Sequence, residues 1–302
     1  MALATILLKK RGVREPHWHP NANEMTYCIE GKALISIFSP GNTHDTFTLS
    51  KGEVVYFPKG YIHHIENIHS GDSRFLLAYD QHLPEDLDLS ESLASMPAHA
   101  LAATFGTKEE GFQKIKKQAK DTFISQRKTT SKLASLSVSN HNKFDLESIK
   151  PQIETKGGSV RIANSLNFPQ LEELALFSLR IAKNGIREPH WHPNATELNY
   201  VIAGKARLTI FSPGGEKDTF TLLPGQGSVI PTGYFHYIEN ASSTALHMAV
   251  YFNHPTPDDI GLSGALSAFS NEVLDSLFST DPAFFAKLPK FQEDRMIVSG
   301  GG

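Results

Sequence analysis

The chain has 302 residues, of which 40% are hydrophobic, 20% charged and 10% aromatic, so one large domain or two ordinary ones with a packed core are expected. The formal net charge of -3 gives no electrostatic reason to expect nucleic acid or an anionic membrane surface as a partner. Cys28 is the single cysteine, which excludes an intrachain disulfide framework, and no apolar run reaches the about 18 residues that a membrane span needs.

Residues 1–10 carry Lys9 and Lys10 after their apolar stretch. A secretion signal has the opposite order, with the positive charge first and a cleavage site of small residues following the apolar part. Together with the single cysteine, this order predicts a cytoplasmic protein.

A long internal repeat decides the expected architecture. Gly12–Glu24 recurs as Gly185–Glu197, and the offset of 173 holds without a gap as far as Asn67 and Asn240, with 34 identities in 56 positions. A unit of this length can hold its own core, so we expect a duplicated domain rather than a solenoid. The two domains are expected at residues 1–150 and 151–302.

Short runs of strand-forming residues dominate each copy. Residues 32–38 and 205–211 are such runs, Ser-Pro-Gly breaks each of them, and residues 45–49 and 218–222 follow as return strands, with a further strand at 51–58. Many short strands separated by Gly and Pro predict an all-β fold of two tandem barrels. A barrel is preferred to a sandwich because it lets distant histidines converge in one interior.

Helix formers follow each barrel. Residues 90–96 and 107–117 are expected to form helices in the first copy, and 262–278 and 281–288 in the second. A polar stretch from Gln126 to Asn142 joins the copies. The second copy also has a lead-in at 157–169 that the first lacks, so the first barrel must lack a strand, borrow one or leave an edge open. Borrowing from a neighbour or from the second barrel predicts a homo-oligomer or a tightly fused pair.

Each copy carries a set of residues suited to a metal ion. A His-x-His pair is followed by a glutamate, and a further histidine lies downstream in a Pro-x-Gly-x-x-His segment. Residues i and i+2 of a strand share a face, so both histidines of the pair can point inward. The predicted ligands are His17, His19, Glu24 and His63 in the first copy, and His190, His192, Glu197 and His236 in the second.

Three neutral imidazoles and one carboxylate suit a divalent transition metal. An octahedral ion with four protein ligands keeps positions for substrate or dioxygen, which favours Mn(II) or Fe(II) over zinc. The alternative is that these histidines are hydrogen-bonded core residues. Two complete sets in register favour the metal, with two ions per chain.

These motifs resemble the cupin superfamily, and Arg-Glu-Pro-His-Trp-His-Pro-Asn-Ala-x-Glu resembles in particular the bicupins related to oxalate decarboxylase. Gly157-Gly-Ser-Val-Arg161 and Phe235–Asn240 extend the similarity over most of the chain. The resemblance implies cupin barrels of the jelly-roll type, Mn(II) at one or both sites, a small carboxylate substrate, and dioxygen in the reaction.

The resemblance also implies an arginine beside each metal, here Arg14 and Arg187, that would hold a carboxylate in a bidentate pair. Strict alternation along the strand places Arg14 on the face opposite His17. Pro16 permits a bulge that would turn the guanidinium inward. The alternative is an exterior, solvated arginine.

Oxalate decarboxylases are further expected to carry a flexible lid after the barrel, with a Ser-Glu-Asn-Ser type segment whose glutamate handles a proton. Residues 80–91 contain no such segment. They carry Glu85 and Asp86, which Asp258 and Asp259 match in the second copy. All four are possible proton donors, with Glu85 and Asp258 as the candidate catalytic residues, and helix capping is the alternative role that the position favours. A stiff acidic pair preceded by proline argues against a decarboxylase lid.

Two functions remain open at this point. The first is a metal-dependent enzyme that acts on a small carboxylate such as oxalate, by decarboxylation or by oxidation with dioxygen. The second is a non-catalytic protein that binds a metal or a small ligand, as germin-like relatives do. Complete ligand sets argue against a storage role but do not separate catalysis from binding.

Overall fold

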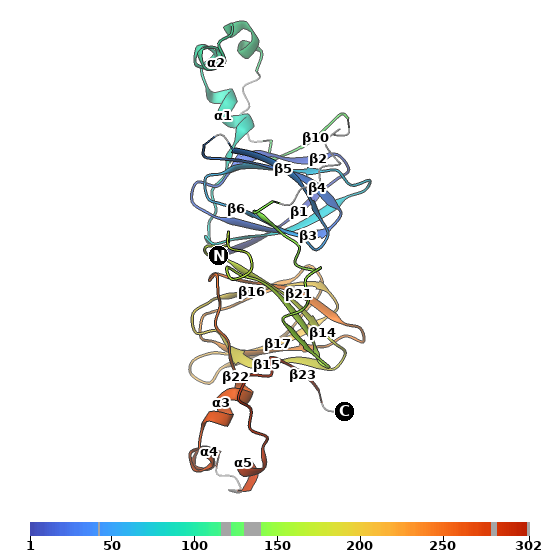
Figure 1. Ribbon diagram of the computed structural model, residues 1–302, viewed down its shortest axis with the longest axis vertical. Coiled ribbons are helices and arrows are strands. Elements are labelled where there is room, and N and C mark those ends of the chain that lie inside the picture. The colour runs from blue at the N-terminus through green and yellow to red at the C-terminus, as the bar shows by residue number, and fades with distance from the viewer. Residues whose placement is uncertain (42, 116–121, 130–139, 279–282, 301–302) are drawn as a thin grey trace. The chain divides into compact units, whose positions relative to one another are not determined.

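The computed structural model describes residues 1–41, 43–115, 122–129, 140–278 and 283–300. They form two compact units, unit 1 (Met1–Asp145) and unit 2 (Leu146–Gly302). The boundary expected near residue 150 therefore lies just inside unit 2. Each unit contains two antiparallel sheets and a short helical extension, as Figure 1 shows. The chain is mostly β, as the sequence predicts.

Unit 1 has one sheet in the order β1-β8-β3-β6-β11 and a second in the order β10-β2-β7-β4-β5, with β9 paired to β2. Its strands are β1 (Ala2–Leu8), β2 (Gly12–Trp18), β3 (Glu24–Glu30), β4 (Lys32–Ser39), β5 (Thr43–Ser50), β6 (Val54–Phe57), β7 (Ile62–Asn67), β8 (Ser73–Tyr79), β9 (Leu87–Asp88), β10 (Ile124–Gln126) and β11 (Lys143–Phe144). The predicted strands at 32–38, 45–49 and 51–58 thus correspond to β4, β5 and β6.

Unit 2 has one sheet in the order β12-β13-β14-β21-β16-β19 and a second in the order β18-β17-β20-β15-β22, with β23 paired to β15. Its strands are β12 (Ile153–Thr155), β13 (Gly158–Ala163), β14 (Ala175–Ile181), β15 (Gly185–Trp191), β16 (Glu197–Ala203), β17 (Ala206–Phe211), β18 (Lys217–Leu222), β19 (Gly227–Ile230), β20 (Phe235–Asn240), β21 (Leu246–Phe252), β22 (Ile260–Gly261) and β23 (Ile297–Ser299). The expected lead-in forms β13, which pairs with β14.

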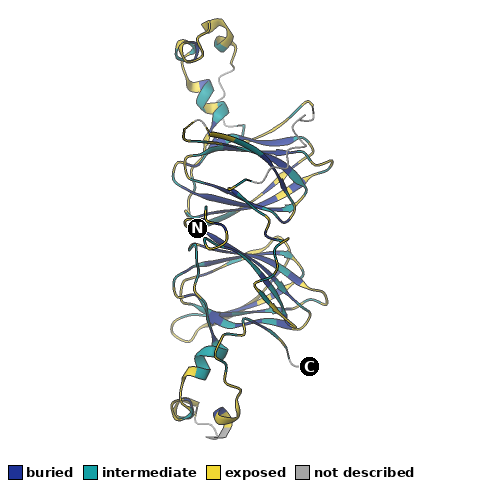
Figure 2. Cartoon of the chain, in the orientation of Figure 1, coloured by how far each residue is buried: buried dark blue, intermediate teal, exposed yellow. Residues whose placement is uncertain are grey.

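The core of each unit lies between its two sheets. Along β4 the side chains of Ile35 and Ile37 are fully buried, and Phe47 of β5 lies opposite Ile35. Alternate residues of a strand share a face, so the apolar ones collect on the inner side. Figure 2 shows this burial concentrated in the strands, with the helical extensions much more exposed. Burying a side chain of this size contributes about 1.5–3 kcal/mol to the stability of the folded state.

Tight turns connect the strands. Gly31, between β3 and β4, has φ 92°, and a Cβ there would lie 2.1 Å from Oγ of Ser73. A side chain is excluded by both the conformation and the space. The turn keeps β3 and β4 in opposite sheets, which places the start of β3 across from β2.

The helical extensions are shorter than the sequence predicts. Unit 1 has α1 (Leu89–Ser95), α2 (Ala98–Phe105) and a 3-10 helix at Glu109–Lys114, while unit 2 has α3 (Leu262–Ala268), α4 (Asn271–Phe278) and α5 (Ala283–Lys287). The predicted helix at 107–117 is therefore a 3-10 helix, and its last two residues lie outside the described residues, as do 281 and 282. The predicted helix 262–278 is interrupted at Phe269, whose backbone is extended.

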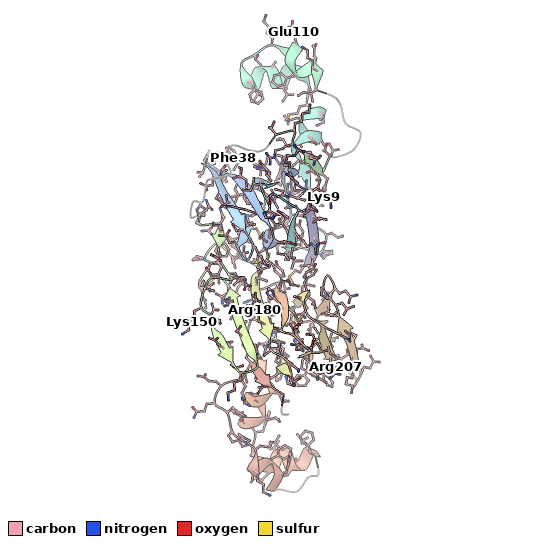
Figure 3. All side chains as sticks on the ribbon, turned by 90° about the vertical axis from the view of Figure 1, so that its right-hand side faces the viewer. Lys9, Phe38, Glu110, Lys150, Arg180 and Arg207 are labelled. Atoms are coloured by element: carbon pink, nitrogen blue, oxygen red, sulfur yellow. The ribbon has the colours of Figure 1, made fainter. Side chains whose placement is uncertain are left out.

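Each extension projects from the end of its barrel. In Figure 3, Glu110 lies at the far end of the unit 1 extension, away from the barrel residues Lys9 and Phe38. Among the described helices of both units, none has the length and apolar character to cross a membrane.

Candidate metal centres

The four predicted ligands of each unit lie together and are buried. Their ligand atoms lie within 4.8 Å of one another in both units. None of the eight side chains is more than 3% exposed. We call the two sets centre 1 (His17, His19, Glu24 and His63) and centre 2 (His190, His192, Glu197 and His236).

Both sheets of a barrel contribute to its centre. His17 of β2 lies directly opposite His63 of β7 in the antiparallel pairing, and His190 of β15 lies opposite His236 of β20. Residues paired in this way have adjacent side chains on one face. The glutamates come from the facing sheet, as the first residues of β3 and β16. Each centre therefore lies in the barrel interior.

Every histidine ligand is oriented by a backbone carbonyl that accepts a hydrogen bond from its Nδ1. The pairs are His17 with Glu15 (2.7 Å), His19 with Glu85 (3.0 Å), His63 with Tyr61 (2.9 Å), His190 with Glu188 (2.7 Å), His192 with Asp258 (2.7 Å) and His236 with Tyr234 (2.8 Å). A carbonyl can only accept, so the proton is on Nδ1. Nε2 is then the nitrogen that can present a lone pair to a metal ion at the centre, as in protein metal sites.

The glutamates are fixed by one oxygen and leave the other for the centre. Oε1 of Glu24 accepts a hydrogen bond from the Thr26 hydroxyl (2.5 Å), and Oε1 of Glu197 accepts one from the Asn199 amide (2.6 Å). Oε2 of Glu24 lies 2.8 Å from Nε2 of His19. A lone pair and a carboxylate oxygen repel at this distance unless a proton or a metal ion lies between them.

These donors fit a divalent transition metal. Nε2 of His63 is buried and has no hydrogen-bond partner among the described residues, and such a group costs about 1–3 kcal/mol. A cation coordinated by this atom and by its neighbours removes that penalty. The combination of imidazole and carboxylate suits Mn(II) or Fe(II).

Protons compete with a cation for these donors. Burial lowers the pKa of His17 to about 2, and the neighbouring His63 acts in the same direction. Burial also disfavours a charge on His19, but hydrogen bonds to Asp86 and Glu24 outweigh it and raise the pKa of His19 to about 10. The pKa of Glu24 is held well below its ordinary value, because the hydrogen bond from His19 and the proximity of His63 outweigh its burial. At neutral pH a cation must therefore displace a proton from His19.

The structure settles the position of the two arginines. The pairing of β2 with β7 shifts register between Arg14 and His17, and that of β15 with β20 shifts between Arg187 and His190. The bulge predicted at Pro16 is thus confirmed. Arg14 is 2% exposed and Arg187 5%, so the alternative of exterior, solvated arginines is wrong.

Aspartates from the segment after each barrel bind these arginines. Asp86 accepts a hydrogen bond from Nη2 of Arg14 at 2.9 Å, and Asp88 forms a short ion pair with Nη1. In unit 2, Asp259 forms a short ion pair with Nη2 of Arg187. The Arg14–Asp88 pair is buried on both sides, and removing one partner of such a pair costs about 3–5 kcal/mol.

Glu85 and Asp258, the expected proton donors, contact the centres through their backbone. Both residues are exposed, and their carbonyls hold His19 and His192. The carboxylate of Asp258 accepts a hydrogen bond from the Asn194 amide at 3.0 Å. The carboxylates that pair with the arginines belong instead to Asp86 and Asp88 in unit 1 and to Asp259 in unit 2. A catalytic role of Glu85 or Asp258 stays a prediction.

Sequence reasoning missed the strands that cover the arginines. Ile124 of β10 pairs with Arg14, and Ile297 of β23 pairs with Arg187. The preceding residues, Phe123 and Met296, have φ values of 52° and 56°, and their carbonyls accept hydrogen bonds from the arginines. The repeat offset of 173 also relates these two strands and could have revealed them. Between residues 122–126 and 295–299, however, Ile124 and Ile297 are the one identical pair.

Comparison with known proteins supports this description. A family model described as Cupin matches residues 1–111 and 144–284. Over 272 residues the chain is 30% identical to oxalate decarboxylase of Bacillus subtilis (strain 168), which covers 87% of this chain and 70% of that enzyme. Over 117 residues it is 32% identical to the probable germin-like protein subfamily 2 member 5 of Arabidopsis thaliana, which covers 38% of this chain and 55% of the plant protein.

A solved structure is similar over nearly the whole chain. It is that of Bacillus subtilis oxalate decarboxylase in work on the enzyme's Mn(II) centres, with a TM-score of 0.87 and 27% identity over 99% of this chain and 81% of that one. The fold of two barrels is thus shared with an enzyme that contains Mn(II).

We predict two bound metal ions per chain, because both ligand sets are complete and buried. His192→Ala should reduce the metal content by about half, since a centre that loses one ligand binds far more weakly. Metal analysis of the purified protein checks this. An unchanged content in the variant, or one ion in fully loaded protein, would contradict the two centres.

We also predict that metal binding releases protons. The raised pKa of His19, about 10, means that this group is protonated at neutral pH, so the ion displaces a proton and its affinity rises with pH up to that pKa. Calorimetric titration at pH 7 in buffers of different ionisation enthalpy measures the protons released. Binding heats that are independent of the buffer would show that His19 holds no displaceable proton.

Proposed function

Because the chain belongs to the cupin family, we propose that it is a metal-dependent enzyme that acts on a small carboxylate such as oxalate. The observation that supports this most is the guanidinium held inside each barrel beside the metal ligands. A buried arginine in this position offers paired N–H donors to a carboxylate. The reaction is decarboxylation, or oxidation with dioxygen.

Mn(II) is the proposed metal, two ions per chain, with Fe(II) as the alternative. His17, His19, Glu24 and His63 would hold one ion, and the four residues of centre 2 the other. The bound ion would supply a Lewis acid that polarises the substrate carboxylate and a position for dioxygen. The similarity to a Bacillus subtilis enzyme with Mn(II) centres supports this choice of metal.

The residues of the chain would bind and orient the substrate and exclude water from it. Arg14 or Arg187 would fix one carboxylate group of oxalate so that the other lies at the metal. In unit 2 the cavity at the centre is lined by apolar side chains, among them Phe177, Val250 and Phe252. A wall that excludes water lowers the local dielectric constant, which would strengthen the ion pair between the arginine and the substrate. An acidic residue after the barrel would move the proton. Asp86 and Asp259 are candidates because they pair with the arginines, and Glu85 and Asp258 are the candidates that the sequence predicts.

A second candidate is a germin-like protein that binds a metal or a small ligand without turnover. The exposed side chains of Glu85 and Asp258 favour it, because a proton donor is then missing from the position the sequence argument gives it. Manganese-loaded protein that binds oxalate in air and leaves it unconsumed would support this candidate over the enzyme.

We place the protein in the cytoplasm, where a reducing environment suits its single, buried cysteine. We further propose a homo-oligomer. The helical extensions expose large apolar side chains, including Phe105, Leu277 and Phe278 at 64%, 69% and 57%, and such surfaces commonly mark association sites. Sedimentation velocity that shows a monomer at micromolar concentration would contradict the oligomer.

The double variant Arg14→Lys/Arg187→Lys tests the role of the arginines. Lysine keeps the charge that compensates the aspartates but loses the planar fork. A lost charge-assisted carboxylate contact is worth about 1.5–3 kcal/mol, so oxalate turnover should fall about 10- to 150-fold while both metals stay bound. Formate with carbon dioxide marks decarboxylation, and peroxide with carbon dioxide marks oxidation.

Arg207→Lys is the matched control. This arginine is labelled in Figure 3, its side chain is 52% exposed, and it pairs with Glu239 on the surface of unit 2. Its substitution should leave turnover unchanged. Equal turnover by the double variant and the control would remove the arginines from the mechanism, and no oxalate consumption by manganese-loaded protein in air would end the oxalate proposal.

A further inference from the structure

The arginine of centre 1 is fully engaged by the protein. Nη1 of Arg14 binds Asp88 and lies 3.4 Å from the carbonyl of Phe123, while Nη2 binds Asp86 at 2.9 Å. The ring of Phe123 covers one face of the guanidinium, 3.8 Å from its Cζ to the ring centroid. Two carboxylates and a ring therefore compete with any external anion for this group.

Asp86 is itself held twice. Its Oδ2 binds Arg14, and its Oδ1 lies 2.7 Å from Nδ1 of the ligand His19. Asp88 is 4% exposed. The guanidinium and its two carboxylates carry a net charge of -1. This negative charge would repel an anion that entered centre 1. The anion would also have to displace Asp86, which both Arg14 and His19 hold.

The arginine of centre 2 has fewer partners. Arg187 pairs with Asp259 and donates to the carbonyl of Met296 at 3.1 Å. Within the described chain, Asp259 is its one carboxylate partner and no aromatic ring stacks on it. Oδ1 of Asp259 has no hydrogen-bond partner among the described residues, and Asp259 lies 3.9 Å from Nδ1 of His192. This pair is neutral overall and its aspartate is held less firmly.

A single replacement accounts for the missing carboxylate. Asp88 lies opposite His17, and Gly261 lies at the same position opposite His190. A Cβ at Gly261 would come within 2.7 Å of Cγ of Asp294 and 2.8 Å of Oε1 of Glu188. The carboxylate of Asp294 fills this space and accepts hydrogen bonds from the backbone of Gly261 and Gly264. It therefore caps α3 and is not a second carboxylate partner of Arg187.

A small cavity of about 20 Å³ also lies beside Arg187. This cavity of unit 2 is lined by Arg187, by the ligands His190, His192 and Glu197, and by Met296. The side chain of Met296 packs against the apolar core of unit 2, whereas its counterpart Phe123 lies on its arginine. An anion in this cavity would reach the guanidinium and the ligand atoms of the metal together.

We infer that the two centres are not equivalent, and that centre 2 binds the substrate carboxylate through Arg187 while Asp86, Asp88 and Phe123 keep Arg14 from external anions. The inference rests on the proposed function for the identity of the substrate. Centre 1 then holds its metal without binding substrate, and Asp88 is the residue that sets this difference.

Oxalate binding to the manganese-loaded full-length chain tests the inference. The titration is carried out without dioxygen, so that turnover is prevented, with calorimetry for the stoichiometry and Mn(II) paramagnetic resonance for the site. We expect one equivalent per chain. Arg187→Lys should weaken this binding at least tenfold, with the metal content unchanged.

Asp88→Asn should produce a second equivalent of bound oxalate, because Arg14 then has one carboxylate partner, as Arg187 has. Asp88 precedes α1 but its side chain makes no capping hydrogen bond, so the helix should persist. Asp88→Gly, which reproduces the residue of unit 2, gives a second version of the same test. Asp72→Asn removes a surface carboxylate that pairs with Lys9 and should leave one equivalent.

Two equivalents of equal affinity in the unsubstituted chain would overturn the inference, as would full oxalate affinity in Arg187→Lys. One equivalent in both folded, metal-loaded Asp88 variants would do so too. Failure of the proposed function has a different signature. If the protein consumes no oxalate in air but binds acetate with the same dependence on Arg187 and Asp88, the oxalate assignment is wrong. The two centres are still not equivalent in that case.

Discussion

In each barrel, one extra residue in the strand that carries the His-x-His pair brings a positive charge to the metal ligands. Without the bulge, alternation along β2 would direct the guanidinium of Arg14 outward while His17 points inward. With it, Arg14 is buried on the same side as His17 and needs compensating charge. The segment after the barrel supplies aspartates for this purpose, and the covering strand supplies a carbonyl. The bulge thus determines what surrounds the centre.

The histidines depend on a second constraint, which is the fixed position of backbone carbonyls. Each Nδ1 donates to a carbonyl either two residues earlier in the chain or in the segment after the barrel, as His17 does to Glu15 and His19 to Glu85. The rings are therefore oriented by the fold itself. This explains how an acidic segment with exposed side chains can still be essential to the metal centre, since its main chain holds one ligand.

Local patterns were enough to predict the ligands and the strands. His17 and His19 share a face by simple alternation, and Pro16 identified the bulge because proline cannot donate in a strand ladder. The roles of adjacent acidic residues were harder to assign from the sequence. Glu85 and Asp86 are both acidic, and which of them turns toward Arg14 depends on the path of the chain over a barrel that the local sequence does not describe.

Contacts between distant segments could not be predicted. Phe123 lies 109 residues from the arginine that it covers, and Asp294 occupies the space of a side chain at Gly261 from 33 residues away. Neither residue belongs to a periodic pattern or a motif. A helix such as 262–278 was predicted as continuous because composition does not show where the chain must turn, whereas the backbone is extended at Phe269, between α3 and α4.

On the proposed function, a small carboxylate binds at a metal ion inside the barrel. Electron–nuclear double resonance on manganese-loaded protein, mixed with ¹³C-labelled oxalate in the absence of dioxygen, tests this most directly. We expect a ¹³C hyperfine coupling from oxalate coordinated to protein-bound Mn(II). Protein that retains its manganese and shows no such coupling at saturating oxalate would contradict it.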